Sequence, residues 1–196
     1  MDKKYQIDTA ENKEFLKEMR NGLLSFGHQF PSPGGGSYYL GDDGTPWKER
    51  SRETWITSRM LHVYSIGSFL GHADSEILAD SALKGLTGEL HDAVNGGWYA
   101  GLTCDNAILP TKQCYAHAFV ILAASSGLLA GRPGAEELLK ELAPYKDDPR
   151  AMNLWGVIEY RRHHRHAAEK AFAKAAEMGD EQALVNLRII ENEKNK

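Results

Sequence analysis

The chain has 196 residues, 42% of them hydrophobic and 26% charged, which is the composition of an ordinary globular protein. Its formal net charge of −4 argues against nucleic acid as a partner, because a phosphate backbone requires a basic surface. Two cysteines without CxxC spacing exclude a disulfide framework and a structural zinc site. The N-terminal segment has no apolar signal region, and no apolar run approaches the ~20 residues that span a bilayer. We therefore expect a cytoplasmic protein with no cofactor, no metal and no membrane association.

Apolar residues at helical spacing predict a first helix over residues 9–27, with Thr9 as its N-cap. The stretch FPSPGGGSYYLGDDGTP follows and predicts a loop and a short β-hairpin. A second Gly-rich turn with a short extended piece is expected at NGGWYAGLTCDNAILP. Further helices are predicted at about 49–70, 75–92, 111–130 and 134–143.

An internal repeat organises the first two thirds of the chain. The stretch GGSYYLGDDGTP corresponds to GGWYAGLTCDNAILP, and Gly71 and Gly131, which end the second and fourth helices, are 60 residues apart. Each unit has a Gly-Gly-aromatic hairpin, an apolar helix, a glycine and a more amphipathic helix. This alternation indicates inner and outer helices, the pattern of an α/α toroid. Two such units do not close a ring, so we expect further units or partners to cover the open ends.

One permanent cation, Arg59, lies within the mostly apolar stretch ETWITSRMLHVYSIGSFLGH of the second helix, residues 53–72. With the 60-residue offset, Trp55 corresponds to Tyr115. Because positions i and i+4 share a helix face, Trp55 and Arg59 lie on one stripe, and Arg59 and Tyr115 are expected to face the same space. The alternative role for Arg59 is an ion pair with a carboxylate such as Glu53 or Glu49.

Four stretches resemble the N-acylglucosamine 2-epimerase family and, within it, the aldose–ketose isomerase branch of mannose and sulfoquinovose isomerases. They are FPSPGGGSYYLGDDG, ETWITSRMLHVYSIGSFLG, GGWYAG and KQCYAHAFVILAASSGLLAGRPGAEELL. The resemblance covers residues 1–140 and implies the N-terminal third of an (α/α)6 barrel. It also implies isomerisation or epimerisation of a sugar in the barrel mouth, by proton transfer through a cis-enediol.

The resemblance implies sugar contacts for an arginine of the WITxRM helix and a tyrosine of the KQxYxH helix, which are Arg59 and Tyr115 here. A guanidinium offers fixed donors to sugar oxygens, and a phenol both donates and accepts. Lys112 and His117 complete the set of candidate substrate-binding residues. His117 corresponds to Thr57 in the repeat, and helical periodicity turns it away from the Arg59 stripe.

No catalytic residue is assigned. The resemblance implies an acid–base pair of two histidines on later helices of the family, beyond the matched stretches, and these roles are not carried over to His163, His164 or His166. Because a missing general base costs ~10²–10⁴-fold in rate, we expect any activity to be weak or lost.

The last fifty residues follow a different pattern. Helices are expected at about 149–161 and 165–178, followed by a capping helix with Asp180 as its N-cap. Residues at the small–large–small positions of a tetratricopeptide repeat are Gly156, Tyr160, Ala168, Phe172 and Ala175.

Residues 141–196 thus resemble one tetratricopeptide or Sel1-like repeat, and the change of pattern near 139–149 favours a fusion of two unrelated fragments, natural or engineered. The run RRHHRH at 161–166 lies at a helix–helix turn, which favours a solvated loop over a metal or anion site.

Two functions follow from these observations. The first is a fragment of a sugar isomerase or 2-epimerase that binds a monosaccharide through Arg59 and Tyr115. The second is a non-catalytic helical-repeat interaction protein or engineered chimera. In both cases a protein partner, or further copies of the chain in a homo-oligomer, is expected to cover the open barrel edge.

Overall fold

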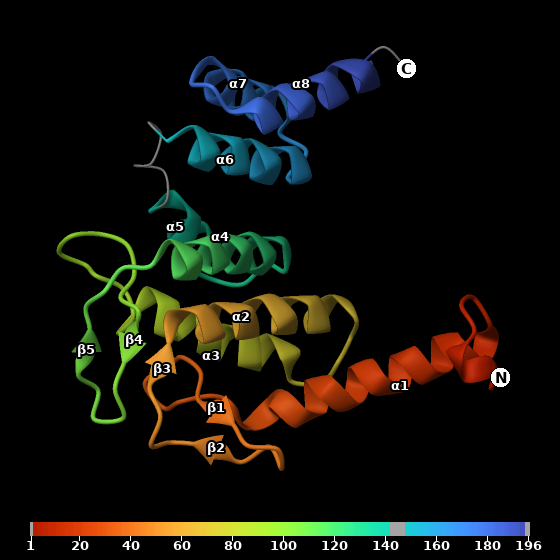
Figure 1. The fold of residues 1–196 in the computed structure, drawn as a ribbon, viewed down its shortest axis with the longest axis vertical. Helices are drawn as coiled ribbons and strands as arrows, with labels where there is room; N and C mark the ends of the chain where they lie inside the picture. The colour runs from red at the N-terminus through yellow and green to blue at the C-terminus, as the bar shows by residue number, and fades with distance from the viewer. Residues whose placement is uncertain (1, 142–147, 195–196) are drawn as a thin grey trace. The chain divides into compact units, whose positions relative to one another are not determined.

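The computed structural model describes residues 2–141 and 148–194. It divides into two compact units, Met1–Leu138 and Leu139–Lys196. The described residues are mostly helical with a few short strands, as predicted (Figure 1). Within this part of the chain, no helix combines the length and the apolar character that crossing a bilayer requires.

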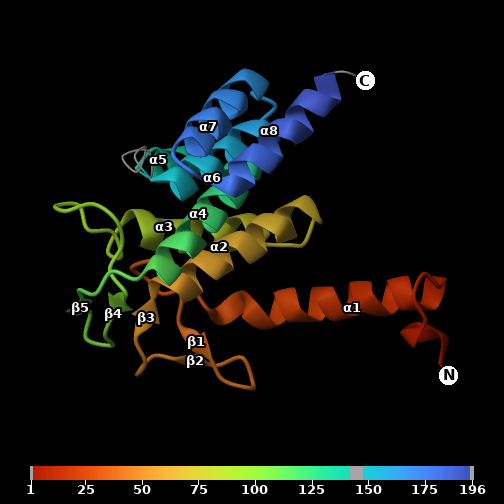
Figure 2. The same ribbon diagram turned by 45° about the horizontal axis from the view of Figure 1, so that its top comes forward.

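The first unit begins with a single turn of 3-10 helix, Lys3–Tyr5, and helix α1, Ala10–Phe26. Thr9 is the N-cap of α1, since its Oγ1 accepts a hydrogen bond of 3.1 Å from the Asn12 N–H, as predicted. Figures 1 and 2 both show α1 running outward from the other helices of this unit. The remaining helical elements are η2 (Gly27–Gln29), α2 (Thr54–Phe69), α3 (Ser75–Thr87), α4 (Cys114–Leu129) and α5 (Ala135–Lys140).

Helix α2 is the centre of the first unit, because it packs against both α3 and α4. The completely or almost completely buried side chains around it are mainly aliphatic and aromatic, and include Leu61, Tyr64, Leu86, Trp98 and Val120. Helix α2 starts later than predicted, because Arg52–Glu53 form strand β3 instead of helix. Helix α3 ends earlier than predicted, at Thr87, where Gly88 leaves the helical conformation.

The strands form two small antiparallel sheets. Strands β1 (Tyr39–Leu40) and β2 (Pro46–Trp47) make the predicted first hairpin. Strands β4 (Gly101–Leu102) and β5 (Ile108–Leu109) make the second, and β3 adds to its edge in the order β3-β4-β5. Arg52 of β3 lies opposite Leu102, so this sheet places the start of α2 beside the second hairpin.

The internal repeat is confirmed in the backbone. The Tyr38 N–H donates to the Phe30 carbonyl at 2.9 Å, and the Tyr99 N–H donates to the Leu90 carbonyl at 3.0 Å. The helix ends also match, since Gly71 and Gly131 both have a φ of 68°. A left-handed residue at this position favours glycine, which explains why both units stop their apolar helix in the same way.

The second unit consists of α6 (Pro149–Arg161), α7 (Arg165–Glu177) and α8 (Glu181–Lys194). Asp180 caps α8 by accepting from the Ala183 N–H at 2.8 Å, as predicted. A Cβ added to Gly156 would lie 2.5 Å from carbons of the Phe172 ring, so the small residue does allow α6 and α7 to approach closely. The middle of the predicted junction at 139–149 lies outside the described residues.

The histidine-rich run lies at the turn between α6 and α7, as expected. The Nδ1 of His164 lies 2.9 Å from the Oε2 of the buried Glu159, and Arg162 lies 3.1 Å from its Oε1. Across residues 2–141 and 148–194, no group of three or more His, Cys, Asp or Glu residues could hold a metal ion.

Candidate functional site

Arg59 and Tyr115 meet between α2 and α4. The Nη2 of Arg59 donates a hydrogen bond of 3.0 Å to the Tyr115 hydroxyl. The two residues are 56 positions apart in the chain, so the contact depends on the packing of α2 against α4. The structure thus brings together Arg59 and Tyr115, which the repeat predicted to face the same space.

Aromatic rings hold the Arg59 guanidinium. Its Cζ lies 4.8 Å from the centroid of Trp55 and 4.5 Å from that of Phe119. Tyr115 contacts both rings, with centroids 6.0 Å from Trp55 and 5.0 Å from Phe119. We call Trp55, Arg59, Tyr115 and Phe119 the arginine platform. Cation–π contacts of this kind fix a guanidinium without neutralising its charge.

The expected alternative, an ion pair of Arg59 with Glu53 or Glu49, is not present. Among the described residues Arg59 has no carboxylate partner, and the carboxylate of Glu53 instead accepts hydrogen bonds from Tyr39 and Trp55. A guanidinium carries several N–H donors, of which Tyr115 engages one. Tyr115 itself is 54% exposed, so the platform is open to a ligand.

Lys112 and His117 lie outside the arginine platform. The Nζ of Lys112 forms an ion pair of 2.8 Å with Asp92 and donates to the Gly96 carbonyl. The Nε2 of His117 accepts from the Trp98 N–H at 3.1 Å, while its Nδ1 donates to the carbonyl of its own helix at Gln113. Both side chains therefore anchor the turn at 92–98, and neither contacts Arg59 or Tyr115.

The repeat explains the position of His117. In the first unit, the Ser37 N–H donates to the Thr57 Oγ1 at 3.0 Å. In the second unit, the Trp98 N–H donates to His117 in the same way. In each unit the residue after the Gly-Gly pair, Ser37 or Trp98, donates its N–H to a side chain of the apolar helix. That side chain is Thr57 in the first unit and His117 in the second, and these two positions correspond in the repeat.

The buried cation of this region is Arg52, which the sequence analysis missed. Its residue is only 4% exposed, and its guanidinium donates to the Ser32 hydroxyl at 3.0 Å and to the Gly35 carbonyl at 2.9 Å. It also contacts Glu89 at 3.3 Å and the Asn106 side chain. Arg52 therefore ties the first Gly-rich loop to the end of α3 and to the second hairpin. Nothing in the local sequence distinguishes it from the neighbouring charged residues at 48–53.

Asp92 is the buried partner of Lys112 and should make the fold sensitive to acid. The hydrogen bond from Lys112, and then those from the N–H groups of Asn95 and Val94, hold its pKa well below the usual range of an aspartate. Because the folded pKa lies below the unfolded one, Asp92 stabilises the fold above pH ~4, and this contribution is lost as the pH falls further.

We therefore expect Asp92→Asn to lower the melting temperature at pH 7 and to narrow the difference in melting temperature between pH 7 and pH 3, as followed by circular dichroism. Asp105→Asn, at an exposed position, is the control and should change neither quantity. An unchanged pH dependence in Asp92→Asn would contradict this role.

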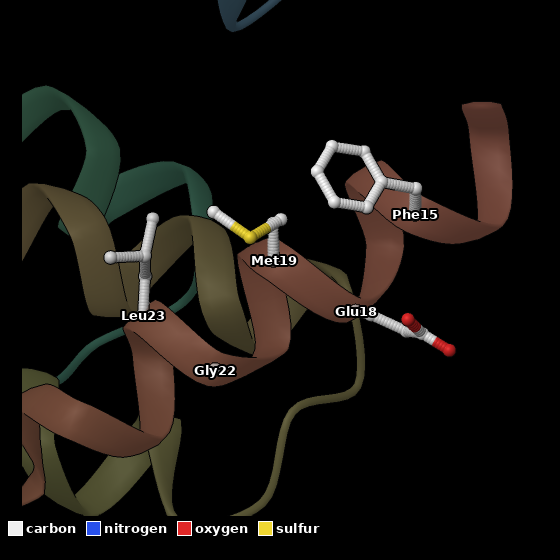
Figure 3. A pocket seen from close by; sticks show the side chains of 5 residues that line it. All are labelled: Phe15, Glu18, Met19, Gly22 and Leu23. Atoms are coloured by element: carbon white, nitrogen blue, oxygen red, sulfur yellow. The ribbon is translucent and has the colours of Figure 1, made fainter. Parts of the chain in front are cut away.

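A shallow groove lies on α1. Phe15, Met19 and Leu23 line one side of the helix, whereas the carboxylate of Glu18 points away from them (Figure 3). The groove has a volume of about 300 Å³ and an almost entirely apolar surface. Its apolar surface offers few hydrogen-bonding groups, which makes it a candidate contact surface for protein.

Two long helices packed side by side, an amphipathic helix against the first of them, and glycine-ended connections define an α/α-toroid protein. The chain belongs to the N-acylglucosamine 2-epimerase (GlcNAc 2-epimerase) family, whose profile matches residues 35–182. The D-mannose isomerase of Thermobifida fusca is 36% identical over 135 residues, which are 68% of this chain and 33% of that protein. The D-mannose isomerase of Pseudomonas cannabina pv. alisalensis is 42% identical over 89 residues, 45% of this chain and 21% of that protein.

Solved structures show the same fold. A crystal structure of D-mannose isomerase aligns with a TM-score of 0.60 and 18% identity over 94% of this chain and 51% of that one. The cellobiose 2-epimerase of Bacillus thermoamylovorans B4167 aligns with a TM-score of 0.58 and 20% identity over 91% of this chain and 54% of that one. These neighbours have the (α/α)6-toroid fold, so the predicted toroid is confirmed. The chain spans about a third of the Thermobifida relative and about half of these solved structures.

The predicted change of family near residue 140 finds no support. The family match runs to residue 182 and so includes α6 and α7, and no comparison indicates a tetratricopeptide repeat or a fusion. The small–large–small pattern has a more general cause. Gly156 lies against the Phe172 ring, and a small residue opposite a large one is common wherever two helices pack closely.

Proposed function

We propose that the arginine platform binds a monosaccharide and that this chain is part of a sugar isomerase or epimerase site. D-mannose is the first candidate ligand, because both curated relatives above are named D-mannose isomerases. The observation that carries the proposal is the environment of Arg59, whose guanidinium lies between two aromatic rings and has no carboxylate partner among residues 2–141 and 148–194. A protein that kept Arg59 only for stability would be expected to neutralise it.

The chemistry of the platform suits a sugar. The remaining Arg59 donors can bind ring or carbonyl oxygens and stabilise the negative charge that develops on an enediol. The Tyr115 hydroxyl can donate to or accept from a sugar hydroxyl, and the indole of Trp55 offers an apolar surface for the C–H groups of the ring.

Proton transfer has no assigned residue. None of the four side chains of the platform is an ordinary general base for carbon acids at neutral pH, and family acid–base roles are not placed on any histidine of this chain. We therefore propose binding as the main property of this site, with weak or absent turnover by the chain itself.

Replacing Arg59 with alanine should weaken mannose binding by ~10–100-fold, since hydrogen bonds from a charged donor are lost. Isothermal titration of the purified chain measures the dissociation constant, and conversion of mannose to fructose measures turnover. Arg188→Ala, at an exposed position of α8, is the matched control and should bind like the wild type. Absence of mannose binding by the wild-type chain, or equal affinity in Arg59→Ala, would refute the proposal.

A second role, as an interaction module, is favoured by α1. Its residues Leu16, Met19 and Leu23 are 55%, 50% and 68% exposed and lie along one stripe. An apolar stripe of this kind costs free energy in water, so we propose that a protein partner or a second copy of the chain covers it. If a second copy covers it, light scattering gives a mass above that of one chain and Leu23→Glu lowers this mass; if a different protein covers it, the purified chain is a monomer. A wild-type monomer would exclude the homo-oligomer.

A further inference from the structure

Glu53 occupies an unusual place beside the platform. It is the last residue of β3 and stands at the N-cap position of α2, yet its side chain makes no capping hydrogen bond. Its carboxylate turns to neighbouring side chains instead. Oε2 accepts from the Tyr39 hydroxyl at 3.0 Å and from the indole Nε1 of Trp55, and Oε1 accepts from the Ser51 hydroxyl at 3.1 Å.

These bonds fix the indole of Trp55. Its N–H is held by Glu53 at one edge, and the ring of Tyr39 packs edge-on against it with centroids 6.4 Å apart. Burial and the carboxylate of Glu53 raise the pKa of Tyr39 to about 12, which agrees with a phenol hydroxyl that donates to a carboxylate. With its N–H and one ring edge engaged, the indole presents its face to Arg59.

The same bonds engage the carboxylate of Glu53, which accepts from three side-chain donors. Its acceptors are directed to Tyr39, Trp55 and Ser51, and Arg59 forms no ion pair with it.

We propose that Glu53 is the positioning residue of the arginine platform. It holds the Trp55 indole at the angle at which the Arg59 guanidinium rests between Trp55 and Phe119, and it acts on the ligand only through these side chains. The effect on ligand affinity rests on the proposed function, whereas the effect on Arg59 is measurable without any ligand.

The ligand-free experiment uses the Nε–Hε resonance of Arg59 in the full chain, identified by its loss in Arg59→Lys. Because two aromatic rings flank the guanidinium, their ring currents should shift this resonance away from that of an exposed arginine. We expect Glu53→Ala to move it towards the exposed position. Glu53→Gln should restore most of the shift, since a carboxamide oxygen still accepts from the indole. Glu49→Ala, which changes an exposed glutamate, is the control.

A double-mutant cycle separates positioning from general loss of stability. Trp55→Phe removes the indole N–H, so adding Glu53→Ala in that background should leave the Arg59 resonance unchanged. If Glu53→Ala moves the resonance equally in both backgrounds, or in neither, the proposal is overturned. A Glu53→Gln variant that behaves like Glu53→Ala also overturns it, because the rescue depends on an acceptor at this position.

The sugar experiment adds the functional consequence. The dissociation constant for mannose should rise about tenfold in Glu53→Ala and much less in Glu53→Gln. If the wild-type chain binds no mannose, the proposed function fails while the resonance experiment still decides the role of Glu53. If mannose binds with equal affinity to wild type and Glu53→Ala, the positioning role in binding is refuted while the proposed function stands.

Discussion

Replacement of Gly85 with alanine is expected to destabilise the chain by about 3 kcal/mol, the upper part of the range for overpacking. A Cβ at Gly85 would lie 2.3 Å from the backbone nitrogen of Gly36 and 2.5 Å from its Cα. These are backbone atoms, which cannot change rotamer to relieve the clash as a flexible side chain can. The loop is also held in place, since the Gly36 N–H donates to the Ser81 carbonyl at 3.3 Å and Arg52 binds the Gly35 carbonyl.

Urea unfolding followed by circular dichroism measures this change in the free energy of unfolding. Gly22→Ala is the matched control, because Gly22 lies within α1 with nothing near its added Cβ. Alanine there should be neutral or stabilising by up to about 1 kcal/mol through helix propensity. A Gly85→Ala protein as stable as the Gly22→Ala protein would show that α3 and the Gly35–Gly36 loop are not in close contact.

Arg52→Met is expected to cost about 2–3 kcal/mol, an effect close to that of Gly85→Ala. The substitution keeps an unbranched chain of similar length but leaves the buried Ser32 hydroxyl and Gly35 carbonyl without their donor. The contribution of Glu89 is smaller, because its side chain is 50% exposed and water can solvate it.

The control is Arg50→Met, at an exposed position two residues earlier. The Arg50 guanidinium rests on the Tyr39 ring at 4.4 Å, and loss of such an exposed contact should cost ~1 kcal/mol or less. Urea unfolding of both variants tests the difference. Equal losses would mean that Arg52 does not connect the loop, α3 and the second hairpin as the structure indicates.

The positions of most helices and the relation between the two repeat units were predictable from the sequence. Helix α6 was predicted at 149–161 and runs Pro149–Arg161, because Asp148 is a strong N-cap and the Pro that follows is tolerated at the first helical position. The 60-residue offset also predicted that Arg59 and Tyr115 face the same space, and the two side chains are hydrogen-bonded in the structure. A repeat carries long-range information, since equivalent positions in neighbouring units face the same side.

The side-chain partners of the site were less predictable. Lys112 stays a predicted sugar contact, and the sequence does not indicate that its charge is paired with Asp92, 20 residues away. His117 is a candidate as well, although the repeat aligns it with Thr57 and predicts that it points away from Arg59; its ring accepts from the Trp98 N–H. The family relationship of the last segment was also missed, because close helix packing produces the same small–large pattern in unrelated folds.

The sequence by itself determined where most helices lie, the caps at Thr9 and Asp180 and the glycine stops, since each depends on spacing and backbone preference within a few turns. It also determined the repeat, which is visible as a fixed offset of 60 residues. Only the tertiary structure decided which cation is buried. Arg52 and Arg59 are seven residues apart, and the local sequence, charged around Arg52 and apolar around Arg59, does not indicate that Arg52 is the more deeply buried of the two. Arg52 meets a carbonyl, a hydroxyl and a carboxylate from distant loops, whereas Arg59 meets two aromatic rings and a phenol. The environment of a charged side chain depends on the groups that the folded chain brings to it, and these come from positions far away in the sequence.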